Sequence, residues 1–235
     1  MTTLPVAIIQ FETPPANVMS QVGEQHHWFI AATGLQPHEY LVIRPDLGET
    51  LPDPASLSAA ILSGSWAMVT DHAEWSERSA AWIRSAMDHQ LPLLGVCYGH
   101  QLMAYALGGK VGDNPRGWEG GAQQITRRAE CAGDMLPCAL PETFTAWLSH
   151  QQSVLQPPAG AQVLASSAMD PCQIIRYSPQ AFSVQFHPEF TATIMAAGQH
   201  SSQRPLASEV SPEPVWPLRL LQAFCQQHRD AERQA

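Results

Sequence analysis

The sequence has no apolar run of the roughly 18 residues that a membrane-spanning helix needs, so a membrane partner is not expected. It is also poor in cations, with 12 lysine and arginine residues against 21 aspartate and glutamate residues, a net charge of −9 and no basic stripe. A nucleic-acid partner is not expected either, because phosphate binding needs clustered positive charge. The first residues lack the charged region of a signal peptide, which predicts a cytoplasmic protein.

Cysteine is scarce as well. The chain has five cysteines, an odd number, and none of them forms a Cys-x-x-Cys pair. This spacing favours reduced thiols and predicts neither a metal site nor a cofactor. Four of the five are expected to be small buried hydrophobic residues: Cys131, Cys138, Cys172 and Cys225.

The N-terminal part of the chain alternates apolar strand patterns with helical patterns. The sequence predicts strands at residues 6–11, 38–43, 59–62 and 91–96, and helices at residues 17–33, 74–89 and 99–107. Such alternation is typical of an α/β fold, with a mostly parallel central sheet flanked by helices on both faces. In these sheets ligands gather at the carboxyl ends of the strands. A length of 235 residues suits a single domain over residues 1–235.

The second part of the chain has shorter strand patterns separated by proline and glycine turns. Strands are predicted at residues 122–126, 144–148, 161–165, 173–177 and 181–186. Their close succession predicts a small antiparallel extension at the edge of the sheet. An irregular connection over residues 199–214 and a closing helix over residues 215–229 complete the expected fold, and residues 230–235 are expected to be frayed.

One cysteine stands apart from the others because of its neighbours. Cys97 lies between a short apolar strand and an amphipathic helix, and Gly95 and Gly99 flank it. This layout is typical of a nucleophile elbow, in which a tight turn lifts the nucleophile clear of the sheet and requires small neighbours. The N-terminus of the following helix favours a thiolate. The alternative is a buried structural cysteine in an ordinary strand-turn-helix unit.

A His-Pro-Glu sequence about ninety residues further on supplies possible partners for this thiol. Pro188 favours an extended His187 and can itself begin a helix. His187 and Glu189 are two positions apart at a strand end, so their side chains can face the same way. Glu189 can then orient the imidazole through one ring nitrogen while the other ring nitrogen faces a thiol. Taken alone, this motif also fits an ordinary surface or core histidine.

Together these motifs resemble the class I glutamine amidotransferases, which have a Cys-His-Glu triad and a flavodoxin-like fold. Residues 95–101 read Gly-Val-Cys-Tyr-Gly-His-Gln and residues 185–190 read Gln-Phe-His-Pro-Glu-Phe. The likeness extends in the family's order to residues 63–65, 107–110 and 148–154. It is strongest to stand-alone members that look like the amidotransferase half of GMP synthase.

The resemblance implies a role for each matching residue. Cys97 would attack the side-chain amide carbon of glutamine and form a γ-glutamyl thioester, His187 would shuttle the proton and Glu189 would orient it. The oxyanion would be held by backbone N–H groups of Tyr98 and of the Gly64 and Ser65 loop. The substrate pocket would be lined by Gln101, Ser149, His150, Gln151 and Gln152.

Three positions depart from the family pattern or leave alternatives. Ser65 and Trp66 stand where family members commonly have glycine and proline, so an oxyanion loop that needs a positive φ would be arranged only on substrate binding. Trp66 itself is either a lid or a core residue. The Glu119 turn either touches substrate or is a turn with a solvated glutamate, and we favour the solvated turn.

Three functions remain open from the sequence. The first is hydrolysis of glutamine with release of ammonia, either alone or with a separate synthase subunit, because no Gly-x-x-x-x-Gly-Lys-Ser/Thr nucleotide loop is present. The second is a γ-glutamyl peptidase that cleaves γ-glutamyl amides of peptides or conjugates by the same chemistry. The third is a non-catalytic binding module, which the presence of all three triad residues disfavours.

Overall fold

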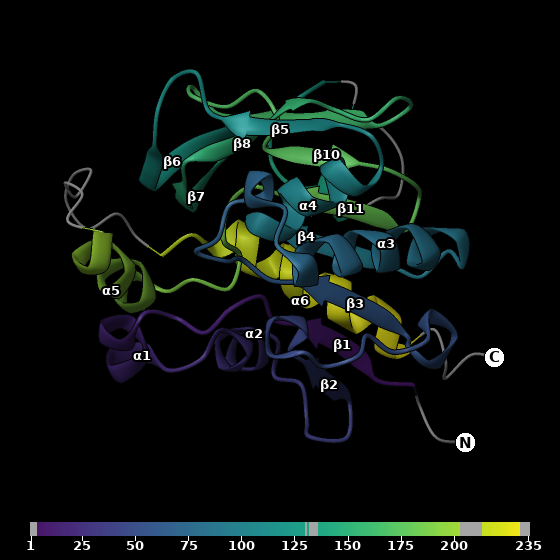
Figure 1. Cartoon of the computed structure of the whole chain (residues 1–235). Coiled ribbons are helices and arrows are strands. Elements are labelled where there is room, and N and C mark those ends of the chain that lie inside the picture. The colour runs from purple at the N-terminus through teal and green to yellow at the C-terminus, as the bar shows by residue number, and fades with distance from the viewer. Residues whose placement is uncertain (1–3, 130, 132–135, 203–212, 231–235) are drawn as a thin grey trace.

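The computed structural model describes residues 4–129, 131, 136–202 and 213–230, and a nine-stranded sheet runs through them in the order β2-β1-β3-β4-β11-β10-β9-β6-β7 (Figure 1). In chain order its strands are β1 (Val6–Ile9), β2 (Tyr40–Ile43), β3 (Ala59–Leu62), β4 (Leu93–Val96), β6 (Glu119–Arg127), β7 (Thr143–His150), β9 (Gln162–Ser166), β10 (Ile174–Arg176) and β11 (Ala181–Val184).

The half of the sheet that contains β2, β1, β3, β4 and β11 is parallel throughout. Strands β1, β3, β4 and β11 are buried along their whole length, which explains their continuous apolar sequences. Their carboxyl ends therefore lie side by side at one edge of the sheet.

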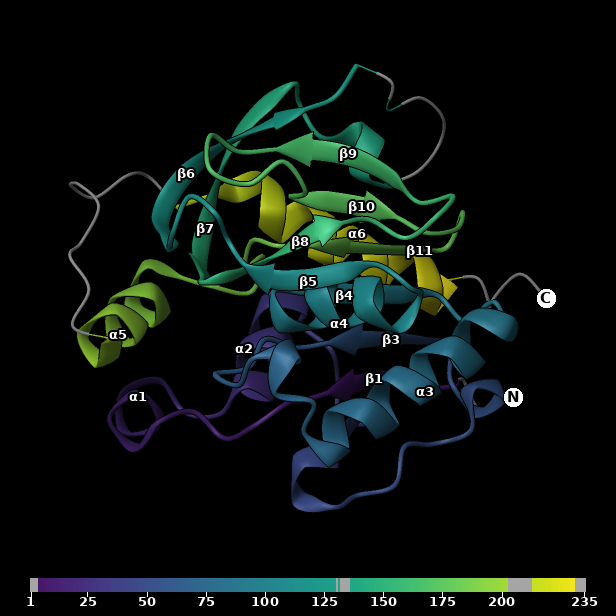
Figure 2. The same cartoon turned by 45° about the horizontal axis from the view of Figure 1, so that its top comes forward.

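Helices cover both faces of this parallel half (Figures 1 and 2). On one face, Val6 and Ile8 pack in a core with residues of α2 (Gln25–Thr33) and α6 (Val215–Asp230). On the other, Ala7 and Ile9 pack with residues of α3 (Glu74–Asp88) and α4 (Tyr98–Ala106). Because side chains alternate along a strand, each apolar run supplies both cores at once.

The remaining four strands, β10, β9, β6 and β7, extend the sheet in antiparallel fashion. A separate two-stranded sheet, β5 (Lys110–Asp113) with β8 (Gln152–Gln156), lies against α4 (Figure 2). The helices α1 (Ala16–Val22) and α5 (Ala192–Ser202) lie together beside the sheet. Short 3₁₀ turns occupy Pro45–Leu47, Pro54–Ser56, Val69–Asp71 and Leu136–Ala139.

The predicted fold class is confirmed, two local predictions are wrong and one small sheet was not predicted. The helix predicted over residues 17–33 is two helices, because Gly23 adopts φ 73° and ψ −160° between them. The two-stranded sheet β5–β8 was not predicted. Pro188 does not begin a helix, since residues after His187 form a turn and α5 starts at Ala192.

Cys131 and Cys138 correct the prediction that they are reduced hydrophobic residues. They form a disulfide, with Cα atoms 5.4 Å apart. Cys172 and Cys225 are free and buried, as expected. The predicted connection over residues 199–214 is wrong at residues 199–202, which belong to α5, and the predicted frayed end is wrong at residue 230, which belongs to α6. Residues 203–212 and 231–235 lie outside the described residues.

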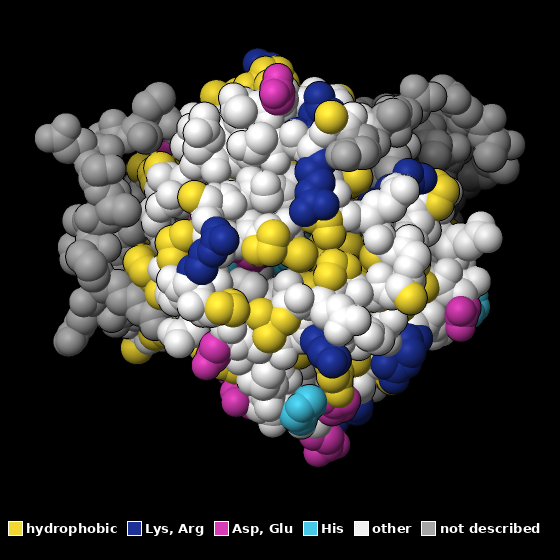
Figure 3. Space-filling model, turned by 90° about the horizontal axis from the view of Figure 1, so that it is seen from above, with side chains coloured by type: hydrophobic (Ala, Val, Ile, Leu, Met, Phe, Trp, Pro, Cys, Tyr) yellow, Lys and Arg dark blue, Asp and Glu magenta, His cyan; other side chains and the backbone are white. Residues whose placement is uncertain are grey.

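Within the described ranges, no helix is long and apolar enough to cross a membrane. The face seen from above in Figure 3 shows hydrophobic side chains gathered around a hollow near its centre. The exposed large hydrophobic residues of the described chain include Leu41, Leu47 and Leu155.

Candidate active site

Cys97 lies at the turn between β4 and α4 in a conformation that is unusual for a residue with a side chain. Its φ is 51° and its ψ is −101°. A positive φ costs a non-glycine residue roughly 1–2 kcal/mol, so the surrounding structure must hold it. The Cys97 N–H donates to the Val184 carbonyl at the end of β11, 2.9 Å away. The elbow predicted from the sequence is therefore present, strained and fixed to the neighbouring strand.

The two glycines that flank Cys97 are required by close contacts. A Cβ on Gly95 would lie 2.6 Å from the Gly99 carbonyl oxygen, and a Cβ on Gly99 would collide with the backbone of Leu62. The Gly99 N–H in turn donates to the Ser63 carbonyl, 3.1 Å away. Strand, turn and helix thus approach each other at distances that exclude side chains.

His187 follows β11 and forms a buried pair with Glu189. The His187 Nδ1 lies 2.8 Å from Glu189 Oε1, and the two residues are 6% and 2% exposed. The backbone N–H of His187 donates to the Trp147 carbonyl, and the Phe190 ring stacks on the imidazole with centroids 3.9 Å apart. The ring is therefore held by Glu189 and Phe190 and the backbone by Trp147, and because Nδ1 faces a carboxylate it donates there.

The electrostatic surroundings of His187 favour its charged form. Burial alone would lower the pKa of the imidazole, but the charges of Glu189 and Cys97 and hydrogen bonds to both outweigh burial and raise the pKa of His187 to about 10. An imidazolium is the form expected at neutral pH, and it stabilises a thiolate beside it.

The loop after β3 lies against both residues. A Cβ on Gly64 would lie 3.1 Å from His187 Cε1 and 3.8 Å from Cys97 Cβ. Ser65 is not in the left-handed region; the non-glycine residues with positive φ in the described chain are Glu12, His72, Gln90 and Cys97. Ser65 thus has no positive φ in this structure, and the arrangement of the loop on substrate binding stays a prediction.

Glu12, which the sequence analysis missed, holds this loop. Its Oε2 accepts hydrogen bonds from the Ser65 hydroxyl and from the Ala67 N–H, both at 2.7 Å. Glu12 has φ 63° and follows β1. Its position just after a parallel strand was the available signal, since such ends collect functional residues.

A cavity of about 320 Å³ opens beside Cys97. Most of the predicted site residues line it: Gly64, Ser65, Cys97, Tyr98, Gln101, Ser149, His150, Gln151, Gln152 and His187. Glu189 lies behind His187 and is not part of the lining. The aromatic residues Trp66 and Trp118 also line the cavity, and Trp66 is 40% exposed, which makes it a rim residue and not a core residue. Trp28, Phe190 and Gly198 were not predicted.

The predicted substrate-binding segment is tied to the elbow helix. The Cys97 sulfur lies 3.7 Å from the Ser149 carbonyl oxygen. Gln101 Nε2 donates to the Gln152 carbonyl at 2.7 Å and to the Gln185 side chain at 3.1 Å. The Gln152 carbonyl also accepts from His150 Nδ1, so it is occupied within the protein.

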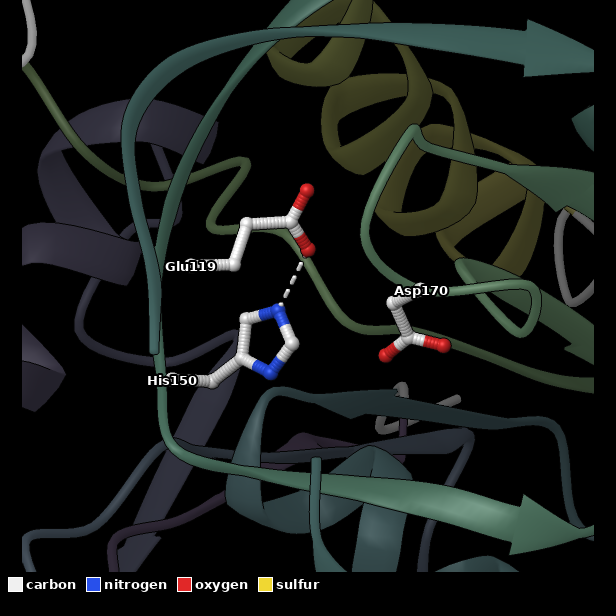
Figure 4. A group of neighbouring side chains, drawn as sticks. All are labelled: Glu119, His150 and Asp170. Atoms are coloured by element: carbon white, nitrogen blue, oxygen red, sulfur yellow. Dashed lines mark hydrogen bonds and ion pairs between the residues drawn. The ribbon is translucent and has the colours of Figure 1, made fainter. Parts of the chain in front are cut away.

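Glu119 contradicts the expectation of a solvated turn. It is 1% exposed and its carboxylate bonds to His150 Nε2 at 2.8 Å (Figure 4). Glu119, His150 and Asp170 have potential ligand atoms within 4.8 Å of one another and are, in the part of the chain described, the group able to hold a metal ion. Both nitrogens of His150 are already hydrogen bonded, so a metal would have to displace either Glu119 from Nε2 or the Gln152 carbonyl from Nδ1.

The fold and the arrangement of Cys97, His187 and Glu189 are those of an α/β cysteine hydrolase. The sequence profile of the family described as "Glutamine amidotransferase class-I" matches residues 36–199. The chain therefore belongs to the class I glutamine amidotransferases, enzymes that hydrolyse a carbon–nitrogen amide bond.

Individual relatives agree with this assignment. A GMP synthase (glutamine-hydrolyzing) from Aeropyrum pernix is 36% identical over 147 residues, covering 63% of this chain and 26% of that protein. The protein of the same name from Ralstonia pickettii is 31% identical over 205 residues, covering 84% of this chain and 36% of that protein. The chain thus spans about a third or less of these relatives.

Among solved structures, a glutamine amido transferase from Methylobacillus flagellatus superimposes with a TM-score of 0.72 at 24% identity, covering 97% of this chain and 90% of that one. A glutamine amidotransferase from Thermotoga maritima has a TM-score of 0.68 at 16% identity, covering 97% of this chain and 93% of that one. These likenesses show the fold.

Proposed function

We propose that this chain hydrolyses the side-chain amide of glutamine through a γ-glutamyl thioester on Cys97 and releases ammonia. The observation that supports this most is the joint approach of three elements: the strained elbow at Cys97, the buried His187–Glu189 pair and the Gly64 loop. A cavity beside the sulfur provides room for the substrate.

In the first half of the reaction the Cys97 thiolate attacks the amide carbon, so a carbon–sulfur bond forms and the carbonyl oxygen becomes an oxyanion. His187, as imidazolium, then protonates the amide nitrogen as the carbon–nitrogen bond breaks and ammonia leaves. In the second half His187 takes a proton from water, which attacks the thioester and gives glutamate and the free thiol. Glu189 holds the imidazole in the required orientation.

The oxyanion is assigned to backbone donors on either side of the sulfur. The Tyr98 N–H is one, because Tyr98 is the first residue of α4 and the first N–H groups of a helix have no partner within it. The second comes from the loop at Gly64 and Ser65, which Glu12 anchors. The glutamyl α-amino and α-carboxylate groups are assigned to Gln101 and to the segment Ser149, His150, Gln151 and Gln152, which lines the cavity.

We further propose that residues 1–235 act as one amidotransferase domain that can serve a separate synthase subunit. The names of the relatives support a synthase of the GMP-forming kind, because both are called GMP synthase. We place the protein in the cytoplasm, where Cys97 stays reduced. The Cys131–Cys138 disulfide is a feature that argues against this location.

Product analysis on purified protein tests the proposal. We expect ammonia and glutamate from glutamine, and no product from a Cys97→Ala variant with an unchanged circular dichroism spectrum. Full activity in that variant would rule out the thioester. A Cys172→Ala variant is the matched control, because Cys172 is also a free, buried cysteine but lies outside the cavity lining.

The second candidate is a γ-glutamyl peptidase with the same chemistry at Cys97. It is favoured by the aromatic residues around the cavity, since ammonia as leaving group needs no such surface. Rapid release of an amine from γ-glutamyl compounds with slow release of ammonia from glutamine would select this second function.

A further inference from the structure

The cavity beside Cys97 is larger than glutamine requires. Its volume of about 320 Å³ falls in the range of pockets that enclose drug-sized ligands. A glutamyl group bound near Gln101 and Ser149 occupies only the side of the cavity that these residues line. The lining residues Trp28, Phe190, Met195 and Gly198 take no part in that assignment, so the part of the cavity that they line has room for a further group.

The chemistry of the reaction places that further group on the leaving nitrogen. His187 donates its proton to the nitrogen that leaves, so any substituent on that nitrogen lies on the side of His187. Phe190 is the residue stacked on the imidazole, with ring centroids 3.9 Å apart. The Trp28 ring meets Phe190 edge to face at 5.7 Å. The leaving-group side is thus bounded by two aromatic rings.

Two residues of α5 complete this side of the cavity. Met195 and Gly198 both line it. A Cβ built on Gly198 would meet no heavy atom within 4 Å, so the helix leaves open space at this point. We call the surface formed by Trp28, Phe190, Met195 and Gly198 the leaving-group subsite.

The charge of the lining limits the chemical class of the group. None of the described residues that line the cavity is Asp, Glu, Lys or Arg. The imidazolium of His187 is already paired with Glu189, 2.8 Å away, and lies beside Cys97. A carboxylate or ammonium on the leaving amine would therefore lose hydration beside the rings without gaining an unpaired partner, whereas an apolar group would gain contact with them. The subsite therefore suits an uncharged apolar substituent.

We propose that the leaving-group subsite binds the apolar substituent of an amine, and that the enzyme cleaves γ-glutamyl amides of aromatic or aliphatic amines. This inference rests on the thioester chemistry proposed for Cys97. The step balances as it does for glutamine: the carbon–sulfur bond forms, the carbon–nitrogen bond breaks, His187 supplies a proton and the neutral amine leaves. Water then releases glutamate and restores the thiol.

A matched pair of substrates tests the charge argument. γ-Glutamylbenzylamide and γ-glutamyl-(4-carboxybenzyl)amide have leaving amines of similar reactivity and differ in one carboxylate. We expect kcat/KM for the benzylamide to exceed that for the carboxybenzylamide about tenfold or more, and to exceed that for γ-glutamylmethylamide. Equal values for the benzyl pair, or cleavage of glutamine without cleavage of benzylamide, would overturn the proposal.

Binding to the Cys97→Ala variant separates this inference from the proposed chemistry. Calorimetry should give a Kd for γ-glutamylbenzylamide at least tenfold lower than for the carboxybenzylamide, whether or not the wild-type protein turns either over. If no amide is hydrolysed but this preference remains, the chemistry is wrong and the subsite stands. If hydrolysis occurs and the two Kd values are equal, the subsite is wrong and the chemistry stands.

A Gly198→Leu substitution tests the location of the subsite. The new side chain enters open space and needs no movement of the neighbouring atoms. We expect the ratio of kcat/KM for benzylamide to kcat/KM for glutamine to fall about tenfold or more. Thr193→Leu is the matched control, because Thr193 is an exposed residue of the same helix outside the cavity, and it should leave the ratio unchanged.

Discussion

The role of Glu189 can be tested through the pH dependence of the reaction. With the pKa of His187 raised to about 10, the imidazolium that we propose as the proton donor to the leaving nitrogen persists through neutral and mildly alkaline pH. The kcat/KM of the wild-type enzyme should therefore decline only as the pH approaches that value. Glu189→Gln removes the negative charge that opposes the effect of burial, so the alkaline decline should move to lower pH.

The size of the change follows from the geometry. The Nδ1 to Oε1 distance is 2.8 Å and both side chains are buried. Charges about 4 Å apart at an effective dielectric constant of about 20 interact by about 4 kcal/mol. Because one pH unit corresponds to about 1.4 kcal/mol, the decline should move down by about 3 pH units. At pH 9 this predicts a fall of about 100-fold in kcat/KM relative to wild type.

The substitution is well suited to the site. A glutamine at position 189 can keep its oxygen toward His187 Nδ1 and place its amide nitrogen where Glu189 Oε2 now has no hydrogen-bond partner among the described residues. Glutamate formation measured between pH 6 and pH 10.5 gives the profile, with Glu142→Gln, at an exposed carboxylate, as control. A variant whose alkaline decline stays within one pH unit of wild type would refute this account of His187.

Three further predictions concern strain, the loop and buried charge. A glycine variant is usually less stable than the alanine variant at the same position. Because residue 97 has φ 51°, which glycine adopts more easily than alanine, Cys97→Gly should be at least as stable as Cys97→Ala, measured by the midpoint of urea unfolding. Glu12→Ala removes the acceptor of two loop hydrogen bonds, so kcat should fall about tenfold or more with little change in KM and a retained fold by circular dichroism. Burial raises the pKa of Asp170, so its ionisation opposes folding above the unfolded-state value of 3.8. Asp170→Asn, which can still accept from the Cys172 N–H, should therefore be more stable than wild type at pH 8 and equal to it at pH 3.5 by urea titration; lower stability at pH 8 would show that this charge is needed.

The parallel half of the fold could be predicted from the sequence because its signals are local. Residues 6–9 and 59–62 are apolar without interruption, and strands buried on both faces have this pattern. The elbow was predictable for the same reason, since Gly95 and Gly99 are spaced by the geometry of a single turn. Boundaries moved by one to a few residues, as at the strand predicted to begin at residue 38, which begins at Tyr40.

The errors come from properties that sequence spacing does not carry. Glu119 is charged and follows a glycine-rich turn, but β6 pairs it with His150 of β7 and so buries it. Cys131 and Cys138 are seven positions apart and form no Cys-x-x-Cys motif, so their spacing did not indicate the disulfide that joins them. The leaving-group subsite was missed because Trp28, Phe190 and Gly198 come from three separate elements and form no motif.

The topology explains why these distant residues converge. In sheet order the neighbours β1, β3, β4 and β11 are parallel, so their carboxyl ends meet along one edge. One site residue follows each of these strands: Glu12 after β1, Gly64 after β3, Cys97 after β4 and His187 after β11. The side-by-side order along the edge is therefore the loop anchor, the proposed oxyanion loop, the proposed nucleophile and its proposed base. Positive φ values at Glu12 and Cys97 fall at two of the same four ends. Two of the four non-glycine residues with a positive φ in the described chain therefore lie at the sheet edge that carries the site, which is the arrangement expected if the parallel sheet supplies the rigidity that holds a reactive thiol in place.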